Sequence, residues 1–457
     1  MTPMPAPDLP ETLNSAGMHW TFVGIGGLLL LTLVREIPRI PARLLVLMAA
    51  AFLDMAGLLM IVPLVPFYVQ RLANGGDGVL LLGMRLGEGQ LTGIVVSAFT
   101  LAQLASAPFW GRFSDRRGRR PAMLVALGMS AVSYVVFGFA DSLPLLLFSR
   151  LLQGLGGGTV GVIQGYVADS TEPAQRARAL GWLSAATNLG VALGPVLGSA
   201  AVRLGDLEVW APEHRDTVAH AAPGVLAAAL CLLTMAFAAR FLRESNESRS
   251  PSRNRVPIRS ALYTVVQRPL EPASRLILTY AIAIGAFTGT TSQLPLSFKA
   301  RFGIDQETIG YVFFWIGAVS VFTRVLLLGP LVDRLGEVRL SRIGIVTLIA
   351  GLVFVSQAES FPALALSIAM LPLGTAFTFP CVTALLSRVV DQQNRGMFMG
   401  LQQTFGGAAR IVMPQLCGYA LDHVGVSAPF LVSSAFVAAT LPLGLGLAAA
   451  VAKRAAH

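Results

Sequence analysis

Charged residues are scarce in this chain: Asp, Glu, Lys and Arg make up 13% of its 457 residues, whereas about a quarter is usual in soluble domains. The three cysteines, Cys231, Cys381 and Cys417, all lie in apolar segments without metal-like spacing, so we interpret them as packing residues. The sequence also lacks the pattern of a phosphate-binding loop, Gly-x-x-x-x-Gly-Lys followed by Ser or Thr. No pair of nucleophile and base is recognisable. We therefore expect no enzyme, no metal site and no cofactor.

The chain is rich in hydrophobic residues. Hydrophobic residues make up 54% of it, and uncharged runs close to the roughly 20 residues that cross about 30 Å of hydrocarbon recur throughout. This pattern predicts an all-α polytopic membrane protein. The net charge of +10 could indicate nucleic acid, but the arginines lie in short loops between apolar runs, where the positive-inside rule explains them. We expect the lipid bilayer as partner, and no nucleic acid.

The densest group of charges is a basic hinge between two uncharged runs, 91–110 and 122–140: Gly111-Arg-Phe-Ser-Asp115-Arg116-Arg-Gly118-Arg119-Arg-Pro121. Runs joined by so few residues must form a tight helical hairpin, with the arginines on one side of the membrane. The order of Gly, Asp, Arg and Gly returns 218 residues later, in Gly329-Pro-Leu-Val-Asp333-Arg334-Leu-Gly336. We therefore predict two copies of one membrane unit.

Apolar runs and basic loops divide the chain into five parts: an N-terminal extension (1–43), a six-helix bundle (44–242), a cytoplasmic linker (243–274), a second six-helix bundle (275–450) and a tail (451–457). The twelve spans are expected near 44–68, 91–111, 121–140, 144–168, 178–202, 221–242, 275–298, 308–331, 341–358, 361–386, 396–420 and 427–450. The apolar segment 18–34 is either an additional span or an interfacial helix. The arginine-rich loops, and with them the C-terminus, are assigned to the cytoplasm.

A second pair of landmarks supports the repeat. Gly181 precedes Pro195 by 14 residues in the fifth span, and Gly400 precedes Pro414 by the same distance in the eleventh. Two related six-helix bundles imply a substrate site near the middle of the membrane, at the interface of the repeats.

Asp54 is an acid within the first span, where a charge costs about 2.5–3.5 kcal/mol, so it should face a cavity or a partner. We interpret it as the group that exchanges a proton for substrate; the alternative is a structural acid bonded to a neighbouring helix. Arg150, near the start of the fourth span, is expected to tune that proton binding. Its alternative is a snorkelling side chain that marks the membrane boundary.

Other polar and small residues are candidates for transport roles. The fifth span carries Gly190, Gly194, Pro195 and Gly198, which predict a bent helix in close contact with a neighbour. Asp115 and Arg116 of the hinge are expected to form a gate. Arg324 is interpreted as a snorkelling side chain. Arg410, near the middle of its span, would either bind an anionic group or pair with Asp54. The candidates for the wall of a substrate cavity are Gln103, Gln153, Asn188, Gln293, Gln402 and Arg410, although the amides are also typical of contacts between helices.

Across residues 44–450 the chain resembles the major facilitator superfamily, whose signature is the basic hinge. It is most similar to the twelve-span drug:proton antiporters, especially the tetracycline efflux transporters, in residues such as Asp54, Gly57, Arg150 and Gly154. The resemblance implies two pseudo-symmetric six-helix bundles. It also implies that the hinge locks the cytoplasmic side, and that the fifth-span motif belongs to an exporter.

The chain departs from the tetracycline transporters at three polar positions. Ser133, Ser320 and Leu348 stand where that family carries an acid, a histidine and an acid. Compared with that family, these three departures imply a more apolar cavity, which would suit a lipophilic compound.

We predict a monomeric secondary transporter of the inner membrane that exports a small, lipophilic, drug-like compound in exchange for protons. Two alternatives stay open. One is a transporter of a specific metabolite, such as a sugar, an organic acid or a siderophore, with Arg410 bound to a carboxylate. The other is a membrane scaffold or sensor on the same fold, without transport.

Overall fold

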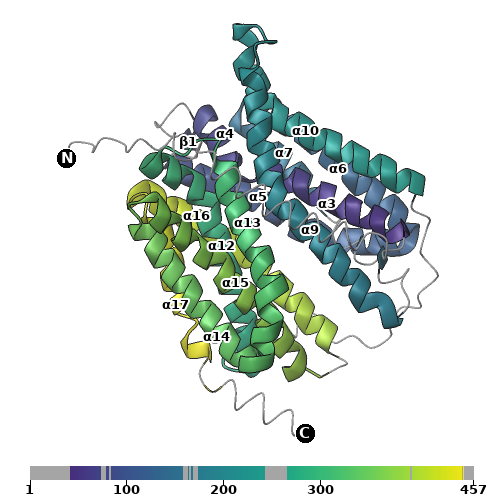
Figure 1. Cartoon of the computed structure of the whole chain (residues 1–457), viewed down its shortest axis with the longest axis vertical. Coiled ribbons are helices and arrows are strands. Elements are labelled where there is room, and N and C mark those ends of the chain that lie inside the picture. The colour runs from purple at the N-terminus through teal and green to yellow at the C-terminus, as the bar shows by residue number, and fades with distance from the viewer. Residues whose placement is uncertain are drawn as a thin grey trace. The chain divides into compact units, whose positions relative to one another are not determined.

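The computed structural model describes residues 42–73, 79–81, 84–157, 163, 166–167, 173–241, 265–391, 394–444 and 446, without the side chains of 42–43, 80–81, 84, 115, 173–178 and 180. The predicted apolar segment 18–34, the linker up to residue 264 and the tail 451–457 lie outside this part of the chain. The described residues are almost entirely helical (Figure 1). One short antiparallel hairpin pairs β1 (Val79–Leu81) with β2 (Met84–Leu86), with Leu80 opposite Arg85.

The chain forms two compact units. Unit 1 comprises Met1–Tyr68, Ala105–Glu247 and Pro295–Ala318, and unit 2 comprises Val69–Leu104, Ser248–Leu294 and Val319–His457. Each unit therefore contains a piece of both predicted bundles.

Most helices of the first half of the sequence belong to unit 1. They are α3 (Ala42–Ile61), α4 (Val65–Leu72), α5 (Glu88–Arg117), α6 (Arg119–Gly138), α7 (Leu143–Leu155), α9 (Pro173–Val202), the 3-10 turn η2 (Arg203–Asp206) and α10 (Pro212–Phe241). The end of α4 and the first part of α5 belong to unit 2.

The second half of the sequence supplies most of unit 2. Its elements are α12 (Pro272–Phe302), α13 (Ile309–Phe322), the π-helical turn η3 (Thr323–Leu327), α14 (Leu328–Gln357), α15 (Phe361–Val389), α16 (Arg395–His423), α17 (Ala428–Ala438) and the 3-10 turn η4 (Pro442–Gly444). The end of α12 and the first part of α13 belong to unit 1.

Eight described helical stretches are long and apolar enough to cross a membrane. One of them, Ile309–Gln357, holds two of the predicted spans, because Gly336 breaks the helix with φ 75°. The other predicted spans correspond to two short apolar helices, Leu143–Leu155 and Ala428–Gly444, and to the more polar α16. Each of the twelve predicted spans thus overlaps a helix of the described chain.

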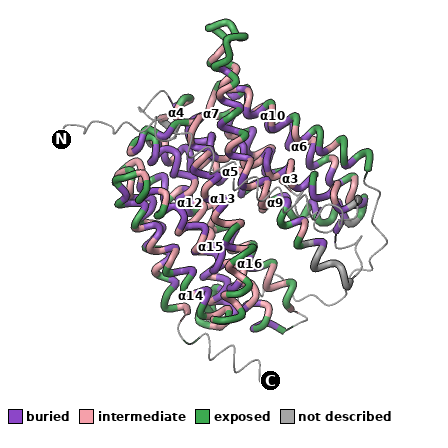
Figure 2. The backbone as a smooth tube through the Cα atoms, in the orientation of Figure 1, coloured by how far each residue is buried: buried purple, intermediate pink, exposed green. Residues whose placement is uncertain are grey.

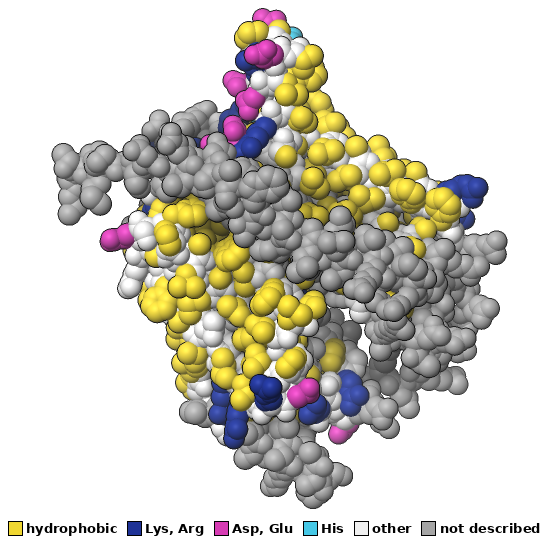
Figure 3. Space-filling model, in the orientation of Figure 1, with side chains coloured by type: hydrophobic (Ala, Val, Ile, Leu, Met, Phe, Trp, Pro, Cys, Tyr) yellow, Lys and Arg dark blue, Asp and Glu magenta, His cyan; other side chains and the backbone are white. Residues whose placement is uncertain are grey.

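Burial and side-chain type fit a membrane protein. Buried and exposed residues alternate along the helices (Figure 2), so that most helices bury one face and expose the other. Exposed faces carry large aliphatic residues, including Val132, Leu232, Val346 and Leu366. In Figure 3 hydrophobic side chains cover much of the visible described surface, while Lys and Arg gather at helix ends. Lipid tails, unlike water, tolerate such an apolar exterior.

The two basic hinges adopt the same unusual backbone. Gly118, between α5 and α6, has φ 100°, and Gly336, within α14, has φ 75°. Residues with a Cβ rarely adopt this conformation, so each hinge requires glycine where the chain turns from one span into the next. The two glycines are 218 residues apart, the spacing of the sequence repeat.

A second repeated contact occurs once in each unit. In unit 1, a Cβ on Gly310 would lie 2.5 Å from the carbonyl oxygen of Pro195. In unit 2, a Cβ on Gly93 would lie 2.6 Å from the carbonyl oxygen of Pro414. Both pairs join a helix of one half of the sequence to a helix of the other. The repeat is therefore expressed in packing as well as in sequence.

Candidate transport site

Asp54 lies inside unit 1 rather than on its surface. The residue is 5% exposed, and its carboxylate interacts electrostatically with the Tyr134 hydroxyl on α6 and the Cys231 thiol on α10. One turn further along α3, a Cβ on Gly57 would lie 3.6 Å from the Tyr134 ring. Asp54 therefore faces neighbouring helices of its own unit, as an intramembrane acid requires.

Arg150 is also buried, with 2% of the residue exposed. Its guanidinium lies over the Phe137 ring, 4.9 Å from the centroid, and interacts electrostatically with the hydroxyls of Tyr134 and Tyr68. Its Nε and Nη2 have no hydrogen-bond partner among the described residues. Tyr134 thus interacts with both predicted coupling residues, Asp54 and Arg150.

Aromatic rings hold the guanidinium of Arg150 in place. Tyr68 stacks on Phe137 with 4.3 Å between centroids and on His220 with 4.1 Å. The Tyr68 hydroxyl donates a hydrogen bond to the backbone carbonyl of His220, and the His220 ring lies 3.0 Å from the carbonyl oxygen of Ala140. A guanidinium over an aromatic face is stabilised by the quadrupole of the ring, which offsets part of its desolvation.

The fifth-span motif, Gly190, Gly194, Pro195 and Gly198 on α9, positions α3. A Cβ on Gly190 or Gly194 would lie 2.5 or 2.6 Å from the carbonyl oxygens of Phe52 and Ala56, and Gly198 meets the Met60 carbonyl in the same way. Those carbonyls are four residues apart, so they form one stripe on α3. Asp54 comes two residues after Phe52 and lies on the opposite side of the helix. The glycines of α9 therefore fix the helix that carries the acid.

The predicted gate residues lie at the hinge between α5 and α6. Arg119 donates to the hydroxyl of Ser114 over 2.8 Å, whereas Arg116 is exposed, and the side chain of Asp115 lies outside the described part. A Cβ on Gly111 would meet nothing within 4 Å.

At the second hinge, Asp333 and Arg334 are exposed. The ion pair there joins other residues: Arg388 of α15 and Glu337 of α14, 2.7 Å apart. Sequence reasoning did not select this pair, because its partners are 51 residues apart.

The amide candidates divide into packing contacts and unsatisfied groups. Gln293 donates to the carbonyl oxygen of Gly89 over 3.1 Å, and Asn188 donates to the hydroxyl of Ser184 on its own helix. Gln402 is fully buried and accepts from Thr383 over 3.3 Å, but its amide nitrogen has no partner in the described residues. Gln103 is half-buried.

Gln153 combines burial with incomplete hydrogen bonding. It approaches the Tyr134 hydroxyl, yet neither its amide nitrogen nor its amide oxygen has a hydrogen-bond partner of normal geometry in the described chain. Gln153 follows Arg150 by three residues on α7, so both side chains lie on the same face of that helix. It therefore belongs with Asp54, Tyr134 and Arg150 to one buried polar cluster, which we call the coupling cluster.

A second polar cluster lies in unit 2. Arg324 in the π-helical turn and Arg410 on α16 are half-buried, and both interact electrostatically with the hydroxyl of Tyr280 on α12. The Nε of each arginine is buried without a hydrogen-bond partner in the described residues. The snorkelling of Arg324 stays a prediction, since its Nε is enclosed by protein while the residue as a whole is half-exposed.

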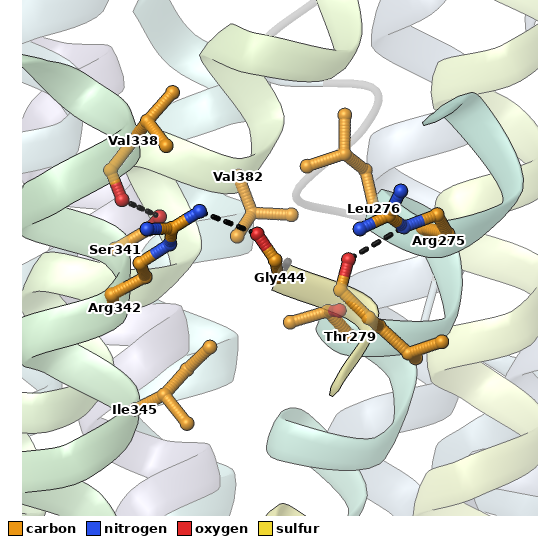
Figure 4. Close-up of a pocket in the computed structure, with 10 residues that line it drawn as sticks. Arg275, Leu276, Thr279, Val338, Ser341, Arg342, Ile345, Val382 and Gly444 are labelled. Atoms are coloured by element: carbon orange, nitrogen blue, oxygen red, sulfur yellow. Dashed lines mark hydrogen bonds between the residues drawn. The ribbon is translucent and has the colours of Figure 1, made fainter. Parts of the chain in front are cut away.

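Figure 4 shows a small pocket in unit 2 beside the C-terminal end of the twelfth span. Arg275 donates a hydrogen bond to the carbonyl oxygen of Leu443, and Arg342 donates one to the carbonyl oxygen of Gly444, each over 2.6 Å. The cavity measures about 20 Å³, which is room for about one water molecule. These arginines cap a helix end, and the pocket is too small for a substrate.

Paired membrane-length helices, a twofold internal repeat and a buried polar cluster define a polytopic membrane transporter. The chain matches the family model of the Major Facilitator Superfamily over residues 47–327 and again over 276–455. It therefore belongs to this superfamily, as its hinge motif predicted.

Individual relatives agree with this assignment. The chain is similar to Multidrug resistance protein 2 of Bacillus subtilis (strain 168), with 27% identity over 88% of this chain and 93% of that protein. It is similar to Tetracycline resistance protein, class B, of Escherichia coli, with 25% identity over 72% and 79%. Its fold is similar to the crystal structure of the human organic anion transporter MFSD10 (TETRAN), with TM-score 0.64, 23% identity and 89% and 100% coverage. The predicted fold class and family resemblance are confirmed.

Proposed function

We propose that this transporter exports a small lipophilic compound across the inner membrane in exchange for protons, as a monomer with its C-terminus in the cytoplasm. The observation that carries the proposal is the burial of Asp54 together with its electrostatic interaction with Tyr134, which also interacts with Arg150. Similarity to a multidrug and a tetracycline resistance protein supports the direction and the kind of substrate.

The coupling cluster suits a proton-exchange step. When Asp54 is ionised, its charge acts on the neutral Tyr134 hydroxyl through a low-dielectric interior, and the Arg150 guanidinium acts on the same hydroxyl. When Asp54 takes up a proton, its electrostatic interaction with the Tyr134 hydroxyl is lost, which changes the surroundings that this hydroxyl offers to Arg150. Protonation of one carboxyl thus changes the energetics of α3, α6 and α7 together, which is what coupling to helix movement requires.

Asp54→Asn tests the proposal in proteoliposomes loaded with the fluorescent lipophilic probe Hoechst 33342. Asparagine keeps the shape of the side chain but cannot release a proton, so proton-driven movement of the probe should fall to the level of empty liposomes. Asp141→Asn, an exposed acid of unit 1, is the matched control and should transport like wild type. Coupled transport that persists in Asp54→Asn removes Asp54 from the mechanism.

A further inference from the structure

The cluster of Tyr280, Arg324 and Arg410 in unit 2 brings two cations to one phenol. Each guanidinium interacts electrostatically with the Tyr280 hydroxyl, and the side-chain amide of Gln403 donates a hydrogen bond to that oxygen over 3.4 Å. With its oxygen accepting this bond, the Tyr280 hydroxyl can donate its own proton elsewhere. Three donors from three helical elements therefore converge on one region of unit 2.

No negatively charged acceptor pairs with these donors in the described part of the chain. Neither Arg324 nor Arg410 forms an ion pair with any described residue, and the Nε of each is buried without a partner. A charge within a membrane protein normally pairs with an opposite charge or a polar group, because an uncompensated one is costly. Two such cations acting on one hydroxyl raise that cost further.

The backbone is modified where these side chains are presented. Arg324 lies in the five-residue π-helical turn Thr323–Leu327, a feature that costs regular hydrogen bonding and is frequent at functional sites. Arg410 lies one turn before the interior Pro414, and Gly406, one turn earlier, lets the Tyr280 ring approach α16, since a Cβ there would be 2.9 Å from a ring carbon.

Apolar side chains border the cluster. The ring of Phe379 lies 5.3 Å from that of Tyr280, and Leu104 lies against Gly407, where a Cβ would be 3.3 Å from a leucine methyl group. A molecule bound here would therefore meet cationic donors at one end and hydrocarbon around them.

We propose that Arg324, Arg410 and the Tyr280 hydroxyl bind the carboxylate of an amphipathic organic anion, which the transporter carries as its substrate. A guanidinium binds a carboxylate through two parallel hydrogen bonds, so two of them can satisfy both oxygens while the phenol donates a further bond. This assignment rests on the proposed transport function and narrows its substrate to lipophilic acids.

Thermal unfolding of the purified full chain tests the assignment without a proton gradient. The probes are three aryl acetates, phenoxyacetate, 2-naphthoxyacetate and 9-anthraceneacetate, each compared with its uncharged amide. A ligand that binds only the folded state raises the unfolding temperature according to its affinity. We expect at least one acid to stabilise wild type while its amide does not.

Variants of the two arginines locate the binding. Arg324→Gln and Arg410→Gln should each weaken binding of the acid about 10- to 100-fold, the effect of losing hydrogen bonds to a charged group. Arg339→Gln, an exposed arginine of the same unit, should bind like wild type. Arg324→Lys and Arg410→Lys keep the charge and should retain part of the affinity, which separates lost binding from lost folding.

Three results would overturn the assignment: no acid stabilises wild type, acid and amide stabilise it equally, or both glutamine variants bind the acid as wild type does. The pH-driven movement of Hoechst 33342 is measured separately on the same preparation. If that movement is observed and the acids are not recognised, the carboxylate site fails while the proton-coupled exporter stands. If the acids bind but a pH gradient moves neither Hoechst 33342 nor the bound acid, proton coupling fails while the binding site stands.

Discussion

At the scale of single residues, the coupling cluster depends on how few polar groups share a large apolar interior. Asp54, Tyr134, Arg150 and Gln153 are each at most 5% exposed, so every charge or dipole there acts with little solvent screening. Tyr134 is the residue that sequence reasoning did not select. A tyrosine in an apolar span gives no signal of its own, and only the packing of α3, α6 and α7 showed that it interacts with both charged partners.

Tyr134→Phe should weaken coupling without unfolding the protein. The ring that packs on Gly57 remains, whereas the hydroxyl that interacts with Asp54 and Arg150 is lost. Proton-driven transport should fall about tenfold and its pH profile should change, since groups in one network couple by about 0.5–3 kcal/mol. The measurement is initial rate against pH in proteoliposomes. Tyr419→Phe, on an exposed position of α16, is the control, and an unchanged profile in Tyr134→Phe would show that the hydroxyl takes no part.

At the scale of helices, glycine decides which pairs approach closely. The motif on α9 leaves no room for a Cβ at the contact with α3, and Gly118 and Gly336 turn the chain at the two hinges. The sequence identified these glycines by their spacing. It could not say which helix they contact, because spacing defines a face of a helix and says nothing of its neighbour.

Gly194→Ala should destabilise the protein through the contact between α9 and α3. A Cβ there would lie 2.6 Å from the backbone oxygen of Ala56, so the helices must move apart at a cost of about 1–3 kcal/mol. Gly181→Ala is a matched control on the same helix: nothing lies within 4 Å of its Cβ, and alanine favours helix by up to about 1 kcal/mol. Unfolding in detergent should occur at lower temperature for Gly194→Ala only. Equal midpoints for both variants would contradict the packing.

At the scale of the whole chain, pieces of both sequence halves join within each compact unit. In unit 1, the end of α9 binds the loop before α13: Ser199 donates to the carbonyl oxygen of Gln306 over 2.8 Å, and Arg203 lies 3.9 Å from a carboxylate oxygen of Glu307. In unit 2, Asp422 accepts hydrogen bonds from the backbone N–H groups of Gly89 and Gln90 at the start of α5. The repeat places equivalent helices together while the polar residues between them differ.

Glu307→Gln should change how stability depends on pH. Burial, and then the nearby Asp305 and Asp206, raise the pKa of Glu307 above its usual 4.5, against the opposing effect of Arg203. The folded protein thus holds this proton more tightly than the unfolded chain. That contribution is present at pH 4 and is lost as pH rises through the raised pKa.

The variant should therefore unfold at a higher temperature than wild type at pH 8 and at a similar temperature at pH 4. The measurement is thermal unfolding in detergent across that range, with Glu208→Gln, exposed near the same end of unit 1, as control. A variant less stable than wild type at pH 8 would show that the Arg203 pair dominates instead.

The sequence by itself determined the helical membrane class, the positions of twelve spans, the internal repeat and the superfamily, because hydrophobic length, loop charge and hinge glycines are local properties of a chain in a bilayer. It also pointed to Asp54, Arg150 and Arg410, since a charge in an apolar span is visible without a structure. Only the tertiary structure decided what those charges interact with: Asp54 and Arg150 with Tyr134, and Arg410, like Arg324, with Tyr280. These partners come from helices far apart in sequence, and contacts between helices depend on packing that local patterns do not encode.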